Sequence, residues 1–174
     1  AVALLYLGLK RLGANIDFYI PHRMIDGYGL SLGSLDTLRE NGSSLIISVD
    51  CGVNAIEEIN TINSIGMEII ITDHHNPKDE LPPAFAIINP KLPETKYPYE
   101  HLAGVGVAYK LLMAIYNKLG IDSAENKLKY MDLVAVGTIA DIVPLTSENR
   151  IFASIGLQHL IEKKNLGLNA LVQI

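Results

Sequence analysis

Two short apolar runs separated by one helical segment constrain the fold of this chain more than any other feature. Residues 44–49 and 68–72 are rich in isoleucine and valine, and each run leads directly into an aspartate. The segment between them, about Asn54 to Ser64, has a helical pattern and is followed by Gly66. Runs that are apolar on both faces and alternate with helices are typical of a parallel sheet with right-handed crossovers. The sequence therefore predicts an α/β fold with a mostly parallel sheet and flanking helices, followed by a helical segment.

The remaining segments extend this pattern on both sides. The opening residues form an apolar helical face that stops at Gly13, and residues 16–20 are predicted to form a further strand. The segment 76–100 is crowded with proline, and we expect an ordered loop that encloses a short strand at 85–88. The other predicted helices cover 34–39, 104–119, 123–139 and 149–163.

Composition and charge limit the class of protein. The 174 residues are 49% apolar and 19% charged, which is a globular composition and not a disordered one. The single cysteine, Cys51, excludes an internal disulfide and fits a reducing compartment. The apolar stretch 1–7 is followed too soon by Lys10 and Arg11 to span a bilayer, so we expect no membrane partner and a cytoplasmic location. The net charge of −5 disfavours a self-sufficient nucleic-acid binder, unless bound divalent metals offset it.

Acidic and imidazole side chains follow both central strands. Asp50 comes directly after the first strand, and Asp73, His74 and His75 come directly after the second. In an open parallel sheet, ligands bind just beyond the carboxyl ends of the strands. Carboxylate and imidazole groups at one edge would suit Mn²⁺, Mg²⁺ or Zn²⁺. The alternative is structural, with Asp50 as a helix cap or turn former and the two histidines as part of a capped turn.

Asp141 is a third candidate in the helical half of the chain. It lies in an otherwise apolar segment, three residues before Pro144. An acid at this place is either solvated at a helix end or directed into a cleft, and spacing alone does not choose between the two.

Three of these segments together resemble the second, third and fourth motifs of the DHH phosphoesterase family, namely 48–52, 72–75 and 140–145. Within that family, four further segments resemble the RecJ exonucleases, namely 19–23, 27–30, 102–108 and 148–150. A bare Asp-His-His triplet is a weak signal, whereas this ordered set covers nearly the whole chain. The resemblance implies a Rossmann-like DHH domain and a metal-dependent phosphodiester hydrolase, with single-stranded DNA degraded from the 5′ end.

The resemblance also implies roles for individual residues. Two divalent ions are expected in the intact enzyme, with Mn²⁺ preferred and Mg²⁺ as the alternative. Asp50 would be the carboxylate that bridges them, His74 would ligate one ion, and Asp141 would complete the shell of that ion. His75 would face the scissile phosphate or the attacking water, which makes His75 and Asp50 the predicted catalytic residues. Asp73 would orient an imidazole without binding metal itself.

Weaker expectations concern the substrate. Arg23 could contact a phosphate, and an ion pair that fixes its loop is the alternative. Gly104 and Gly106 resemble a helix start that cradles phosphate, although close helix packing explains such a pair equally well. Cys51 is expected to be structural, because water activated by metal needs no thiol nucleophile.

The chain departs from the family pattern at both ends. It begins without methionine, inside an uncapped helix, and the Asp-rich first motif of the family is absent. We therefore expect a fragment, with a truncated DHH core at 1–145 and a helical extension at 146–174 leading toward a missing C-terminal nucleic-acid-binding domain. Such a fragment is expected to be inactive alone. The alternatives are another DHH enzyme, acting on short oligonucleotides, cyclic dinucleotides or pyrophosphate, or a non-catalytic module that binds nucleotides or a partner.

Overall fold

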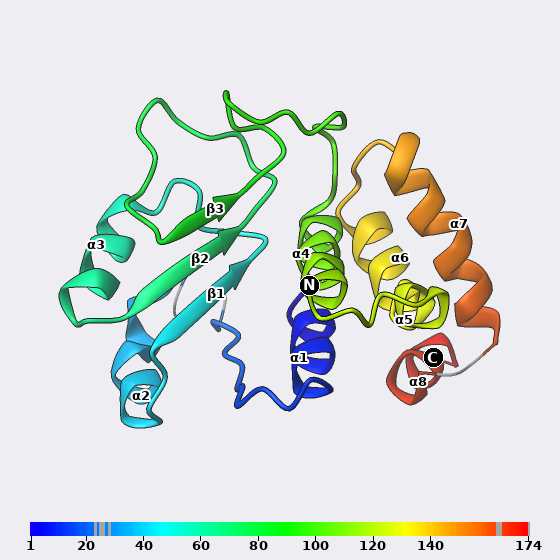
Figure 1. Ribbon diagram of the computed structural model, residues 1–174, viewed down its shortest axis with the longest axis horizontal. Coiled ribbons are helices and arrows are strands. Elements are labelled where there is room, and N and C mark those ends of the chain that lie inside the picture. Colours follow the sequence, from blue (N-terminus) through cyan, green and yellow to red (C-terminus); the bar gives the residue numbers. More distant parts are fainter. Residues whose placement is uncertain (23, 25–26, 28, 163–164, 174) are drawn as a thin grey trace. The chain divides into compact units, whose positions relative to one another are not determined.

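The computed structural model describes residues 1–22, 24, 27, 29–162 and 165–173, and its contacts group into two compact units. Unit 1 comprises residues 1–15 and 101–174, and unit 2 comprises residues 16–100. Unit 2 holds a parallel sheet with flanking helices, and unit 1 is helical (Figure 1). The predicted fold class is confirmed. The predicted domain boundary near residue 145 differs from these units and stays a prediction.

Three parallel strands form the sheet of unit 2. The strands are β1 (Leu45–Val49), β2 (Glu68–Thr72) and β3 (Ala86–Ile88), in the order β1-β2-β3 (Figure 1). Val49 lies opposite Thr72, and Thr72 lies opposite Ile88. The residues that follow the three strands therefore emerge in line at one edge of the sheet.

Apolar side chains of β2 and the crossover helix form the core of unit 2. Helix α3 (Ile56–Ser64) connects β1 to β2, and α2 (Leu35–Glu40) follows the 3₁₀ turn η1 (Leu32–Ser34). The buried core residues are Leu35, Ile59, Ile62, Met67, Ile69 and Ile71. Each buried aliphatic side chain of this size contributes about 1.5–3 kcal/mol. Burial of alternate side chains of β2 thus determines which face of the strand packs against the core, and it fixes the position of the strand end.

The predicted strand at 16–20 is wrong, because this segment has no regular secondary structure. Among the described residues β1 pairs only with β2, so this segment is not hydrogen-bonded into the sheet. Its backbone instead makes a local bond, in which Phe18 N donates to Asp17 Oδ1 at 2.8 Å. Phe18 and Ile20 remain 53% and 64% exposed, so neither side chain is packed as a strand in a sheet would require. The alternating sequence pattern predicted a strand, but this segment does not pair with the sheet.

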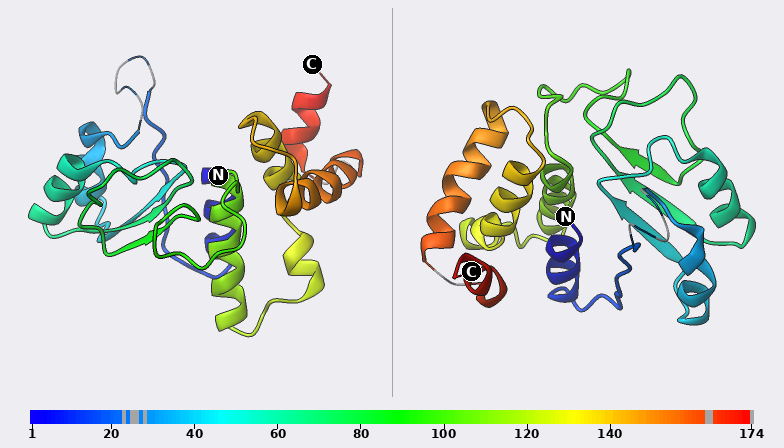
Figure 2. Two further views of the ribbon diagram at one scale, coloured as in Figure 1. Left: turned by 90° about the horizontal axis from the view of Figure 1, so that it is seen from above. Right: turned by 180° about the vertical axis from the view of Figure 1, so that it is seen from behind.

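The helices of unit 1 are α1 (Val2–Lys10), α4 (Gly104–Lys118), α5 (Ala124–Leu128), α6 (Met131–Ala140), α7 (Ser147–Ile161) and α8 (Leu166–Val172). Helix α1 packs on α4, and α6 packs on α7 (Figure 2). The single helix predicted at 123–139 is divided, because Tyr130 leaves helical geometry and caps α6. Its hydroxyl donates to Leu7 O at 3.4 Å, a partner too distant in sequence to predict. Within the described part of the chain, no helix combines the length and apolar character that crossing a membrane requires.

Glycines allow the helices of unit 1 to approach closely. A Cβ on Gly137 of α6 would lie 2.8 Å from Val105 Cγ1 of α4. A Cβ on Gly156 of α7 would lie 2.1 Å from the carbonyl oxygen of Met131, at the start of α6. Because no side chain fits at either contact, α4, α6 and α7 form one closely packed group.

Candidate metal centre

A tight turn after β1 presents Asp50 at the edge of the sheet. The backbone N–H of Asp50 donates to Thr72 O at 2.8 Å, which ties the turn to the end of β2. Asp50 has a φ of 64°, in the left-handed region that non-glycine residues seldom occupy. Gly52 has a φ of 110°, and a Cβ there would lie 3.0 Å from Ser48 Oγ. The turn therefore requires glycine at 52 and leaves the Asp50 carboxylate exposed.

Three side chains converge at this edge. Asp50 Oδ1 lies 3.1 Å from His74 Nε2, and the two histidine rings are 4.6 Å apart between centroids, tilted by 59°. One ligand atom from each of Asp50, His74 and His75 falls within 4.8 Å of the others. His74 is buried, whereas Asp50 and His75 are exposed. The cluster is thus anchored from inside the protein and open on its outer side.

The carboxylate of Asp73 organises the turn that carries both histidines. It is 1% exposed, and its Oδ2 accepts from Val53 N at 3.0 Å. Its Oδ1 accepts from the backbone N–H of His74 at 2.7 Å and of His75 at 3.2 Å, and it lies 2.7 Å from His75 Nδ1. Burial alone would raise the pKa of this carboxyl, but these hydrogen bonds outweigh burial and lower the pKa below its usual value. An ionised Asp73 favours a proton on His75 Nδ1 and leaves Nε2 to accept a proton or bind a metal.

Two asparagines hold the adjoining loops, and sequence reasoning missed both. Asn89 is 4% exposed and donates from Nδ2 to His75 O at 2.9 Å. Asn54 donates from Nδ2 to Asn76 O at 3.0 Å, and its Oδ1 accepts from Lys78 N at 2.8 Å. A signal for Asn89 existed, because it directly follows β3 just as the acidic residues follow β1 and β2. It was missed because only acids and imidazoles were expected to matter at strand ends.

Cys51 does not add a reactive group to this cluster. Burial raises the pKa of its thiol to about 11, and the nearby carboxylates of Asp73 and Asp50 act in the same direction. The thiol is therefore protonated at neutral pH, whereas nucleophiles and metal ligands are thiolates. This supports the structural role expected for Cys51.

The donor set fits a divalent cation. One carboxylate and two imidazoles are oxygen and nitrogen ligands of the kind that Mn²⁺ and Zn²⁺ accept. The 3.1 Å between Asp50 Oδ1 and His74 Nε2 matches two adjacent ligands of an octahedral ion with bonds of about 2.1 Å. The hydrogen bond from His75 Nδ1 to the buried Asp73 fixes this ring and leaves its Nε2 available beside such an ion.

The other predicted site residues belong to unit 1 or lie outside the described part of the chain. Asp141 is the exposed C-cap of α6, and its N–H donates to Gly137 O at 3.1 Å. Gly104 and Gly106 are buried in the first turn of α4, where a Cβ on Gly106 would lie 3.3 Å from the side chain of Leu102. Arg23 lies outside the described residues. The roles assigned to all these residues, and to the cluster in unit 2, stay predictions.

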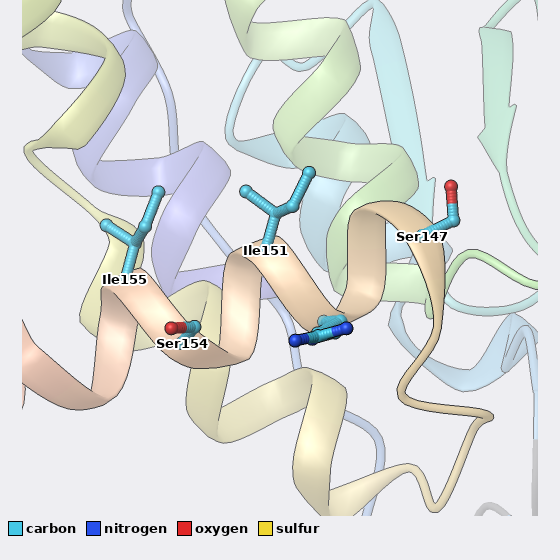
Figure 3. A pocket seen from close by; sticks show the side chains of 5 residues that line it. Ser147, Ile151, Ser154 and Ile155 are labelled. Atoms are coloured by element: carbon cyan, nitrogen blue, oxygen red, sulfur yellow. The ribbon is translucent and has the colours of Figure 1, made fainter.

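A surface depression in unit 1 is formed by one face of α7 (Figure 3). Its lining residues are Ser147, Arg150, Ile151, Ser154 and Ile155. They include no histidine, cysteine or carboxylate, so the depression offers neither a metal ligand set nor a general base.

The chain matches the DHH family, N-terminal domain, over residues 1–138. It is 45% identical over 166 residues to the single-stranded-DNA-specific exonuclease RecJ of Bacillus subtilis, covering 95% of this chain and 20% of that protein. It is 39% identical over 185 residues to the RecJ of Escherichia coli, covering 100% of this chain and 32% of that protein. The chain thus spans about a fifth to a third of the length of these curated relatives.

Solved structures agree with these matches. A crystal structure of exonuclease RecJ bound to manganese superposes with a TM-score of 0.84 at 37% identity, covering 99% of this chain and 43% of that chain. The structure of RecJ in complex with Mn²⁺ from Thermus thermophilus gives a TM-score of 0.78 at 34% identity, covering 98% of this chain and 24% of that chain. The resemblance predicted from the motifs is confirmed.

Proposed function

This chain belongs to the DHH family, and we propose that it is part of a metal-dependent nuclease that hydrolyses single-stranded DNA from its 5′ end. The observation that carries the proposal is the cluster of Asp50, His74 and His75 at the sheet edge, with Asp73 buried behind it. Relatives named as single-stranded-DNA-specific exonucleases and structures containing Mn²⁺ support the substrate and the metal. Because the chain spans a minor part of those relatives, the activity is assigned to the full-length protein. Residues 1–174 alone are expected to be inactive.

Three side chains are assigned to the metal. Asp50 would bridge two divalent ions, His74 would bind one of them, and Asp141 would complete that ion's shell. The bridging role suits Asp50 because its carboxylate is exposed and His74 Nε2 lies 3.1 Å from Oδ1. Two such ions, Mn²⁺ or Mg²⁺, supply Lewis acidity toward a phosphate and lower the pKa of a bound water.

His75 is assigned to the proton transfer. Asp73 holds its Nδ1–H, so Nε2 is the nitrogen that would face the attacking water or the scissile phosphate. As the water oxygen bonds to phosphorus, one proton of the water would pass to Nε2. The bond between phosphorus and O3′ of the terminal nucleotide would break, and the departing O3′ would take a proton from solvent, so that the nucleotide leaves with a free 3′-hydroxyl. The ionised Asp73 would then stabilise the imidazolium, because its carboxylate lies 2.7 Å from the ring.

The substrate itself is assigned from the relatives. We propose single-stranded DNA as the partner of the full-length protein, with further nucleic-acid contacts supplied by chain beyond residues 1–174. The formal charge of −5 supports this division, because phosphate backbones reward lysine and arginine.

The test is Mn²⁺-dependent nucleotide release from 5′-phosphorylated single-stranded DNA by the full-length protein. Asp50→Ala should abolish release without changing the circular dichroism spectrum, because no adjacent side chain can replace a bridging carboxylate. Asp79→Ala is the matched control, since it removes the same charge from an exposed position of unit 2 and should retain full activity. Unchanged turnover in Asp50→Ala would refute the metal assignment.

The same assay separates the alternatives. Rapid cleavage of dinucleotides without release from long strands would move the assignment to another DHH phosphoesterase. Binding of nucleotides without cleavage of any phosphoester would indicate a non-catalytic module.

A further inference from the structure

A fully buried amide in unit 1 connects three separate segments of the chain. Asn149, in the first turn of α7, is 0% exposed. Its Nδ2 donates to His101 O at 2.6 Å and to Pro144 O at 3.0 Å, and its Oδ1 accepts from Ala103 N at 3.4 Å. The amide thus joins α7 to the loop after α6 and to the residues that lead into α4.

The chemistry of these three bonds requires an amide. Two partners of Asn149 are carbonyl oxygens and one is an N–H, so the side chain must donate twice and accept once. Asparagine and glutamine are the residues that can do this from one planar group. Aspartate would set a carboxylate against two carbonyl oxygens, and alanine would remove all three hydrogen bonds, one of them to the buried N–H of Ala103.

The loop that Asn149 holds contains an unfavourable backbone conformation. Ile142, next to Asp141, has a φ of 57°, which is an outlier for a β-branched residue. Its side chain is 89% exposed, so no burial compensates for the strain. Strained residues persist where the surrounding structure fixes them, and they concentrate at functional sites. The bond from Asn149 to Pro144 O is one such restraint, two residues beyond Ile142.

Asn149 belongs to the closely packed group of helices α4, α6 and α7. Gly137 and Gly156 bring α6 against α4 and α7, with no room for a Cβ at either contact. The Asp141 N–H donates to Gly137 O at 3.1 Å, which fixes the backbone of Asp141 to the end of α6 on one side. Asn149 fixes the loop on the other side. The backbone on either side of Asp141 is therefore anchored to the same packed group of helices.

We propose that Asn149 is a positioning residue for Asp141. By bonding Pro144 O and the backbone before α4 at once, it keeps the strained loop closed and the Asp141 carboxylate in one orientation. The inference rests on the proposed function, because it takes Asp141 as a metal ligand. It adds a residue whose effect on the metal is exerted entirely through the loop.

The experiment compares Mn²⁺ affinity, measured by calorimetry and Mn²⁺ electron paramagnetic resonance, in variants of the full-length protein. Asn149→Ala should weaken binding of one ion by about 10-fold, the low end of the roughly 10–100-fold that loss of a direct outer contact to a ligand causes, because Asn149 acts on Asp141 through the loop. Val134→Ala is the control for lost stability, because Val134 is fully buried in α6 and its side chain is purely apolar. It should lower the unfolding temperature and leave Mn²⁺ affinity as in the wild type.

A double-mutant cycle measures the coupling between Asn149 and Asp141 in Mn²⁺ affinity, which a general loss of stability would not produce. In an Asp141→Ala background, Asn149→Ala should produce no further loss of Mn²⁺ affinity, because the residue through which it acts is gone. Should Asn149→Ala fail to fold, Asn149→Ser enters the same cycle. Its hydroxyl can serve one of the three partners, and an intermediate loss of affinity is expected.

Two results would overturn the inference. One is a loss of Mn²⁺ affinity in the Asn149 variants no larger than in Val134→Ala. The other is a loss of Mn²⁺ affinity on Asn149→Ala that is as large in the Asp141→Ala background as in the wild type. Both results differ from failure of the proposed function. In that case Asp50→Ala would leave Mn²⁺ binding intact, and this outcome would refute both proposals.

Discussion

The buried carboxylate of Asp73 offers the sharpest test of how the histidine turn is built. Asp73→Asn preserves the shape of the side chain and removes its charge. In the native protein Oδ1 accepts from two backbone N–H groups and contacts the His75 ring, while Oδ2 accepts from Val53 N. An amide has one acceptor oxygen. If that oxygen takes the place of Oδ1, the NH₂ group faces the Val53 N–H, and a buried donor is left without an acceptor.

The magnitude follows from these contacts. An unsatisfied buried donor costs about 1–3 kcal/mol, and a hydrogen bond to a charged group is worth about 1 kcal/mol more than a neutral one. Loss of the charge also removes the cost of burying it, which offsets part of the weakened bonds. We expect Asp73→Asn to lower the free energy of unfolding of unit 2 by about 3 kcal/mol at pH 7. That is a large part of the roughly 5–15 kcal/mol that typically separates folded and unfolded proteins.

The effect should depend on pH with a defined sign. The pKa of Asp73 is lowered in the folded state, so its ionised form contributes stability that is complete above the pKa of the unfolded chain. This contribution is lost as the pH falls through the lower pKa of the folded state. The difference between the wild type and Asp73→Asn should therefore be constant from about pH 5 to pH 7 and shrink in more acidic solution.

Urea unfolding of the full-length protein, followed by hydrogen exchange at β1 and β2 amides, measures this difference for unit 2. Asp122→Asn is the control. Hydrogen bonds from Asn117 and Lys127 also lower the pKa of Asp122, but this carboxyl lies at the surface, where solvent screens its interactions, so loss of its charge should have little effect on stability. The reasoning is refuted if Asp73→Asn costs no more than Asp122→Asn, or if its cost stays constant at the acid end.

Two further predictions concern packing and the thiol. Gly156→Ala should lower the free energy of unfolding by about 3 kcal/mol, because the new Cβ would lie 2.1 Å from the backbone oxygen of Met131. Gly137→Ala should cost less, about 2 kcal/mol, because its nearest neighbours are side-chain atoms of Val105 at 2.8 Å or more. Equal unfolding temperatures for the two variants would contradict this. In metal-free protein, Cys51 should react with iodoacetamide at pH 8 roughly 200-fold more slowly than a free cysteine, because a pKa of about 11 leaves little thiolate. The rate should rise steadily up to that pH, and a rate at pH 8 equal to that of free cysteine would show the thiol to be accessible and ionised.

The centre of the candidate site could be predicted from sequence because it depends on local order. A β-branched run specifies its strand, parallel strands end at one edge, and whatever follows them must meet there. Asp50, His74 and His75 were located by this rule alone. The same rule locates Asn89 when amides are considered together with acids and imidazoles.

Other features could not be predicted because their causes are distant in sequence. The segment 16–20 has the alternation of a strand, but a strand forms only where a neighbour accepts its hydrogen bonds. The partners of Asn149 include His101, 48 residues away, so neither its burial nor its role is visible in a local window. The division of the helix at Tyr130 has the same origin, in a contact with α1.

The hydrogen bonds of Asp73 have a thermodynamic consequence for the apo protein. The turn at 73–75 is organised by the protein's own N–H groups, so its shape exists before any cation arrives. In sites that fold only on metallation, much of the binding free energy is consumed in ordering the ligands. At the proposed metal site that ordering would be completed during folding, so little of the binding free energy would be consumed in arranging the turn. Exchange of one divalent cation for another should then leave the backbone of the turn unchanged.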